Sequence, residues 1–222
     1  MRKVIRDNGL SIVLLTLFVL FWLGQSVAGY REHSAEQLDH GASPPSYSTY
    51  LRSAHFWEAT AENWESEFLQ IFCYVMLTAM LFQRGSAESK DPDKQEPVDR
   101  DPRLSQGNPD APWPVRRGGV ALKVYEHSLS LSFFALFLVS IGLHALAGAA
   151  VYNEEQAEHG AGEALSFLQY ATTSRFWHES LQNWQSEFLA IASVVVLSIF
   201  LRQRGSPESK PVDAPHSETG GG

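Results

Sequence analysis

The feature that most constrains this chain is an uncharged run of 21 residues, 9–29, directly after a basic N-terminal segment. A helix of about 20 apolar residues is long enough to cross the ~30 Å hydrocarbon core of a lipid bilayer. Three more apolar runs follow among the 222 residues, at 68–83, 129–151 and 188–201. The sequence therefore predicts an all-α integral membrane protein in which four transmembrane helices form a bundle.

The second and fourth runs are short, and nearly the same phrase precedes each of them. The chain reads FWEATAENWESEFL at 56–69 and FWHESLQNWQSEFL at 176–189. With an offset of 120, residues 50–90 match residues 170–210 at 20 of 41 positions. The first and third runs match with an offset of 119. Such internal similarity indicates a duplication, here of a unit with two spans.

Two spans per unit give both units the same orientation, as in parallel-repeat transporters. We predict repeat 1 at 1–90 and repeat 2 at 121–210. The spans are expected at the following approximate positions: 9–29 and 66–83 in repeat 1, and 127–150 and 186–202 in repeat 2.

The segment between the repeats, 91–120, has a composition unlike that of the runs. It holds six prolines among many charged residues. A segment so poor in apolar residues cannot bury a core, so we expect a long disordered cytoplasmic linker. The tail at 211–222 is expected to be disordered for the same reason.

The distribution of basic residues predicts the orientation. Of the 17 Lys and Arg residues, 14 lie in the N-terminal segment, the central segment and the tail; the others are Arg31, Arg52 and Arg175. Basic loops stay on the cytoplasmic side. Both termini are therefore expected to be cytoplasmic in a multi-pass protein. The first run also resembles a signal peptide, with a small-residue end at Ser26-Val27-Ala28, and its cleavage is an alternative that leaves this orientation unchanged.

The repeated phrase places tryptophans and a polar pair just before the second span of each repeat. Tryptophan favours the membrane–water interface, so these residues are expected to anchor the helices: Trp57, Trp64, Trp177 and Trp184. Each Asn lies one helical turn before a Glu, and Gln25 and its counterpart His144 lie near the outer ends of the neighbouring spans. We predict an outer-face polar cluster from the following side chains: Gln25, Asn63 and Glu67 in repeat 1, and His144, Asn183 and Glu187 in repeat 2. Pairing across the repeats is equally allowed.

Two interpretations of this cluster remain open. Ionisable groups at membrane depth are costly and often functional, which favours a proton- or cation-binding site. The structural alternative is that the two glutamates cap or orient helices in the headgroup region. His40 and His159 occupy matching outer-loop positions, and a loop metal site there is a further alternative to a solvated acidic loop.

Several classes of function lack support in this sequence. A net charge of −8 disfavours nucleic acid as a partner. Cys73, the single cysteine, excludes an internal disulfide and a Cys-rich metal site. No phosphate-binding Gly-rich loop and no Ser-His-Asp pattern is present, so we expect no enzymatic activity, no metal and no cofactor.

Four motifs together resemble a known family: the NGLS opening, the GQSVAG end of the first run, the EQ…HG outer loop, and the duplicated NWxSEFL…QRGSxESK. They resemble an uncharacterised family of bacterial four-span membrane proteins, grouped as a domain of unknown function. The resemblance implies a bacterial cytoplasmic (inner) membrane location. It implies no catalytic residue and no ligand.

The expected function is that of a non-enzymatic structural or accessory membrane protein. Its partners would be the lipid bilayer and either a second copy or another membrane protein. The alternative is a small proton- or cation-coupled transporter or channel that uses the interfacial carboxylates. A weaker alternative is a quinone- or haem-linked redox subunit, because His144 is the one histidine well inside a run.

Overall fold

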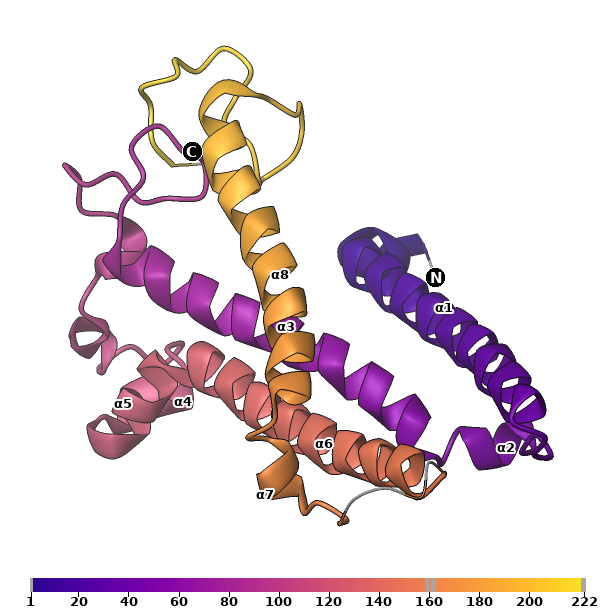
Figure 1. The fold of residues 1–222 in the computed structure, drawn as a ribbon. Helices are drawn as coiled ribbons and strands as arrows, with labels where there is room; N and C mark the ends of the chain where they lie inside the picture. The colour runs from indigo at the N-terminus through magenta and orange to yellow at the C-terminus, as the bar shows by residue number, and fades with distance from the viewer. Residues whose placement is uncertain (1, 159, 161–162, 221–222) are drawn as a thin grey trace. The chain divides into compact units, whose positions relative to one another are not determined.

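The computed structural model describes residues 2–158, 160 and 163–220, and every regular element in this part of the chain is helical (Figure 1). Four helices are long: α1 (Arg2–Asp39), α3 (Ala54–Met80), α6 (Ser128–Glu158) and α8 (Ser174–Phe200). The short elements are α2 (Tyr47–Tyr50), η1 (Pro97–Asp99), η2 (Pro102–Ser105), α4 (Trp113–Arg117), α5 (Gly119–Glu126) and α7 (Phe167–Tyr170). The expectation of an all-α chain is confirmed.

Three helices among the described residues, α1, α6 and α8, are long and apolar enough to cross a membrane. α1 has 38 residues and α6 has 31, or about 57 and 46 Å of helix at about 1.5 Å per residue. Both exceed the ~30 Å hydrocarbon core, so their ends extend beyond it. α3 is not in this group, because its first half carries Glu58, Glu62, Glu65 and Glu67.

The chain divides into two compact units. Unit 1 consists of Met1–Thr60 and Leu143–Ala171, and unit 2 of Ala61–Gly142 and Thr172–Gly222. The division falls within α3 and α6, so each of these helices contributes one part to each unit. The units therefore do not coincide with the two halves that the sequence comparison delineates.

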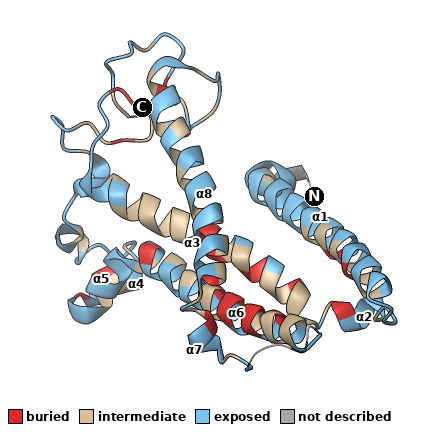
Figure 2. Cartoon of the chain, viewed as in Figure 1, coloured by how far each residue is buried: buried red, intermediate tan, exposed pale blue. Residues whose placement is uncertain are grey.

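The core of unit 1 is built from tyrosines packed on glycines. Tyr50 is 5 % exposed and Tyr170 is fully buried (Figure 2). A side chain at Gly29 would overlap the Tyr50 hydroxyl, and a side chain at Gly148 would overlap the Tyr170 ring. The missing side chains are thus what lets the two tyrosines pack against α1 and α6.

The short helices that carry these tyrosines begin in the same way. The Ser46 side chain accepts a hydrogen bond from the Thr49 backbone at the start of α2, and Ser166 accepts one from Gln169 at the start of α7. Serine is among the preferred N-cap residues, because its oxygen satisfies a backbone N–H that the helix leaves unpaired.

In unit 2, aromatic side chains join the long helices. Phe72 on α3 lies with its ring centroid 5.0 Å from that of Phe134 on α6. Phe137 of α6 makes an edge contact with Trp184 of α8, at 6.3 Å between centroids. α3, α6 and α8 therefore share an apolar core in this unit.

The segments expected to be disordered have local order in the structure. Residues 97–126 contain η1, η2, α4 and α5, and Val115 and Leu122 are buried. Asp101 and Glu96 cap the two 3₁₀ helices, and both of these helices have proline in the first turn. These contacts are between near neighbours, so they require no hydrophobic core of the kind that the composition lacks.

Candidate functional site

The predicted polar residues of α3 and α8 that lie in unit 2 take part in two contacts. The Asn183 amide donates a hydrogen bond to a Glu62 carboxylate oxygen at 2.6 Å. The Gln70 amide donates to the Glu187 backbone oxygen at 2.8 Å. Both bonds join α3 to α8 across more than 100 residues of sequence, so these helices are tied together at this level.

The carboxylates of Glu67 and Glu187 are close enough to interact electrostatically. Glu67 is exposed on α3, whereas Glu187 is partly buried on α8. Two acidic side chains that face each other repel when both are charged and can share one proton or one cation. The residues that the sequence matches to each other are therefore neighbours in unit 2. Asn63, one turn before Glu67, is exposed.

The predicted tryptophan anchors differ in their surroundings. Trp177 is 43 % exposed and makes an edge contact with the Trp184 ring, at 6.0 Å between centroids. Trp57 contacts the Phe56 ring at 5.5 Å, and Trp64 is partly buried. An exposed indole on an apolar helix suits an interface position, so the anchor prediction stands for Trp177.

Gln25 and His144 belong to unit 1. Gln25 lines a pocket of about 420 Å³. His144 is completely buried on α6. Because Asn63, Glu67, Asn183 and Glu187 belong to unit 2, the predicted clusters stay predictions. Of the matched outer-loop histidines, His40 is exposed just after α1, and His159 lies outside the described residues.

The pocket beside Gln25 contains ionisable side chains that the sequence analysis did not select. His33 of α1 and His55 of α3 stack with 4.3 Å between ring centroids. His55 Nε2 lies 3.5 Å from a carboxylate oxygen of Glu154. The signal in the sequence was the acidic surroundings of His33, but its meeting with His55 depends on how the helices are rotated.

The repeated QRGSxESK sequence follows α3 at 83–90 and α8 at 203–210, and it forms the same hydrogen-bonded loop both times. The Gln83 backbone donates to the Ser89 hydroxyl at 2.8 Å, and the Gln203 backbone donates to Ser209 at 2.9 Å. Gly85 and Gly205 have φ of +88° and +86°. Glycine is favoured there because other residues rarely adopt positive φ. The motif is thus a structural loop that ends each helix.

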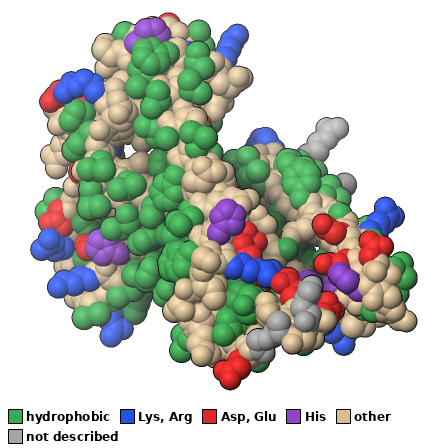
Figure 3. Space-filling model, viewed as in Figure 1, with side chains coloured by type: hydrophobic (Ala, Val, Ile, Leu, Met, Phe, Trp, Pro, Cys, Tyr) green, Lys and Arg blue, Asp and Glu red, His purple; other side chains and the backbone are tan. Residues whose placement is uncertain are grey.

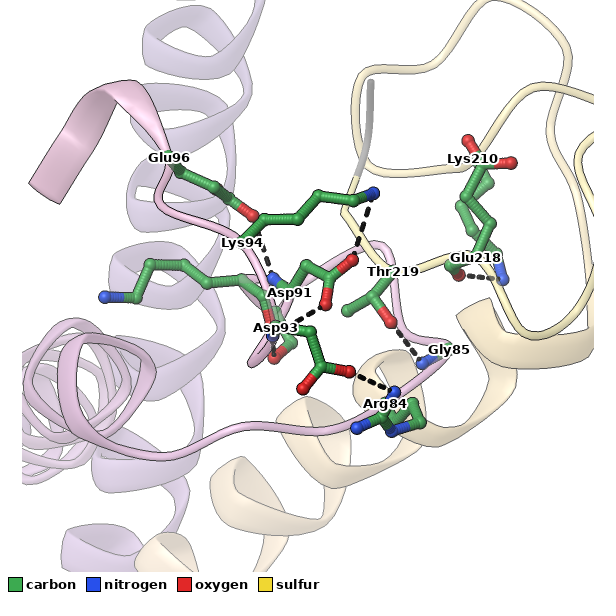
Figure 4. Close-up of polar contacts among 11 residues, drawn as sticks. Arg84, Gly85, Asp91, Asp93, Lys94, Glu96, Lys210, Glu218 and Thr219 are labelled. Carbon is green, nitrogen blue, oxygen red and sulfur yellow. Dashed lines mark hydrogen bonds and ion pairs between the residues drawn. The ribbon is translucent and has the colours of Figure 1, made fainter.

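The loop after α3 also contacts the C-terminal segment of unit 2 (Figure 4). The Gly85 backbone donates to the Thr219 hydroxyl at 2.8 Å, and the Gly220 backbone donates to the Ser86 oxygen at 2.9 Å. Lys210 is 1 % exposed, and its ammonium donates to the backbone oxygens of three residues at 2.8–3.3 Å: Pro215, His216 and Glu218. Burial lowers the pKa of Lys210.

A carboxylate of this loop lies in a poorly solvated position. The Tyr74 hydroxyl donates to Glu88, which also interacts with Glu208 at the matching position of the second loop. Burial raises the pKa of Glu88, and the neighbouring Glu208 adds to the increase, while the bond from Tyr74 opposes it. Glu88 and Glu208 are thus a second pair of sequence-matched acids that are neighbours.

No group of three or more His, Cys, Asp and Glu side chains in the described ranges is arranged to hold a metal ion. The described contacts that bring together distant residues are those between helices and loops. Their geometry offers binding and proton exchange, with neither a nucleophile–base pair nor an oxyanion site assembled among the contacts above.

The fold and these contacts define an all-helical protein with three helices able to cross a membrane. The chain belongs to the family of a domain of unknown function, DUF6766, whose model matches residues 1–221. No curated protein and no solved structure matches this chain.

Proposed function

We propose that this protein is a four-span integral membrane protein built from two tandem two-helix repeats, with a non-enzymatic structural or accessory role. The observation that carries the fourth span is the attachment of α3 to α8. Gln70 bonds to the backbone at Glu187, and Ser86 after α3 bonds to Ser198 at 2.9 Å. The two levels on α8 are 198 − 187 = 11 residues apart, about 17 Å along a helix and more than half of the bilayer core.

A span through α3 also satisfies its polar first half. Glu62 and Glu67 precede the apolar part of the helix by less than two turns and would lie at the outer interface, where water reaches them. The charge distribution supports cytoplasmic termini, and the resemblance to bacterial membrane proteins supports an inner-membrane location. Interhelical hydrogen bonds such as Asn183–Glu62 are typical of helix association in bilayers.

Cysteine accessibility tests the four-span topology. In a Cys73→Ser background, single cysteines replace His40 and Arg100, which lie on either side of α3. A membrane-impermeant maleimide should label His40→Cys in intact cells and Arg100→Cys only after permeabilisation. If α3 does not cross, both positions lie on one side of the membrane and are labelled alike. Equal labelling in intact cells would therefore refute the fourth span.

A second candidate function is favoured by the Glu67–Glu187 pair. Two carboxylates that share one site at membrane depth can bind a proton or a metal cation, as carriers and channels require. In this case the protein is a small proton- or cation-coupled transporter or channel. The partly buried Glu187 would be the site's less solvated acid.

Proteoliposomes test the second candidate. A pH-sensitive dye inside the vesicles should report proton uptake by the wild-type protein under an inward proton gradient. Glu67→Gln combined with Glu187→Gln should abolish that uptake, whereas Glu126→Gln, an exposed acid at the end of α5, should leave it unchanged. Wild-type vesicles no leakier than empty ones would eliminate the transport function and leave the topology intact.

A further inference from the structure

The pocket of about 420 Å³ in unit 1 has an acidic lining. It is lined by Gln25, Ala28, Gly29, Glu32, His33, Glu36, Tyr50, His55, Glu58 and Ala59. Three of these side chains are carboxylates, and none is a lysine or arginine. Figure 3 shows acidic and histidine side chains gathered over this part of unit 1. The potential in such a pocket attracts cations and repels anions.

The pocket wall contains a buried group that lacks a hydrogen bond. His33 is 9 % exposed, and its Nδ1 has no hydrogen-bond partner among the described residues. An unpaired polar nitrogen out of contact with water costs free energy, which a bound N–H or O–H donor would recover. This observation is independent of the acidic lining, and it points to a ligand that carries hydrogen-bond donors.

The size and the donor set favour an organic cation over a metal ion. A metal ion needs several ligand atoms within about 2–2.6 Å of one point, and no described group of His, Cys, Asp and Glu side chains is arranged to provide them. A volume of about 420 Å³ is within the range of small-molecule sites. The Tyr50 ring in the wall adds a face that attracts an ammonium group.

Comparison with the matched positions of the second half separates framework from lining. Gly29 and Tyr50 have counterparts in Gly148 and Tyr170, which pack in the same way. The charged lining has no such counterpart. Glu32 is matched by Val151, His33 by Tyr152, His55 by Arg175 and Glu58 by His178. The packing of the unit therefore does not require the acidic lining, which is specific to the first half.

We propose that unit 1 binds a small organic ammonium ion, such as a short-chain amine or diamine, in the pocket between α1, α2 and the start of α3. Glu58 and Glu36 neutralise the ammonium charge, and the His33 nitrogen accepts one of its hydrogens. His55, held by Glu154, supports the His33 ring by stacking on it. This assignment is separate from the Glu67–Glu187 pair and does not depend on transport.

Titration calorimetry on the full-length protein in detergent tests the proposal, with 1,4-diaminobutane as the probe and 1,4-butanediol as its uncharged counterpart. The diamine should bind and the diol should not. Glu36→Gln combined with Glu58→Gln should weaken diamine binding by about tenfold or more, because each charge-assisted hydrogen bond contributes about 1.5–3 kcal/mol. His55→Arg, which introduces the residue of the second half, should weaken it similarly.

A matched control is Glu155→Gln, which removes the same charge at the position that corresponds to Glu36. It should bind the diamine like the wild type, and the tryptophan fluorescence of every variant should report a folded protein. No diamine binding by the wild type, or equal affinity in Glu36→Gln/Glu58→Gln, overturns the proposal. Stoichiometric binding of Zn²⁺ that is lost in His33→Ala, without diamine binding, overturns it in favour of a metal site.

Discussion

The substitution Gly148→Ala should destabilise unit 1, because α6 has no room for a side chain at this position. A Cβ atom there would lie 2.5–2.8 Å from three atoms of the Tyr170 phenol group, whereas carbon atoms in ordinary contact are about 3.5–4.0 Å apart. Tyr170 is fully buried, so its ring has no open space into which to move. Overpacking of this kind costs about 1–3 kcal/mol, and the better helix propensity of alanine returns about 1 kcal/mol. We expect a net loss of about 1–2 kcal/mol.

Gly142→Ala is the matched control on the same helix. A Cβ atom at Gly142 meets nothing within 4 Å, so only the gain in helix propensity, up to about 1 kcal/mol, should remain. The free energy of unfolding is measured by SDS titration in mixed micelles with tryptophan fluorescence as the signal. Gly148→Ala should unfold at lower SDS than the wild type, and Gly142→Ala at the same or higher SDS. If the two variants are equally stable, the packing of Tyr170 on α6 is wrong.

Three other predictions concern the loops of unit 2. The pKa of Glu88 is higher in the folded protein than in the unfolded chain, so stability should fall as pH rises from about 4.3 through the raised pKa; Glu88→Gln should remove this slope in SDS titrations at pH 4–8. Ser209→Ala leaves the Gln203 backbone N–H without its acceptor, which should cost about 1 kcal/mol and speed hydrogen exchange at Gln203, an effect that Ser206→Ala should not reproduce. Lys210→Met removes the donor for three backbone oxygens and should expose the segment after it to proteolysis in detergent; wild-type resistance of this variant would contradict the buried position of Lys210.

The long helices could be predicted from the sequence because apolarity over 20 residues is a local property. The uncharged runs that underlie α1 and α6 are readable without any knowledge of neighbours. α3 was harder, because its acidic first half lowers its mean hydropathy and only contacts with α8 support its place beside a span. Its predicted start at about residue 66 also differs from Ala54, where the helix begins.

The contacts in the candidate sites could not be predicted, since they depend on helix rotation and on loop paths. The sequence placed Asn63 one turn from Glu67, yet the structure pairs Asn183 with Glu62, a residue that no pattern selected. His33 and His55 are 22 residues apart with no spacing that predicts their meeting. The order of the 83–90 and 203–210 loops was missed for a different reason: composition measures the lack of a core, whereas these loops are held by backbone and serine hydrogen bonds.

The two halves of the sequence retain side chains whose role is to shape the backbone. Ser46 and Ser166 cap short helices, Ser89 and Ser209 close the loops, and glycines make room for tyrosines. Where the halves differ, the residues line the acidic pocket of unit 1. A difference in such lining costs the common framework nothing, so the lining was free to change its charge. The retained Glu67 and Glu187 do not fit this division, because carboxylates near each other at membrane depth destabilise the fold when both are charged. Their presence in both halves is therefore better explained by a shared proton or cation than by packing.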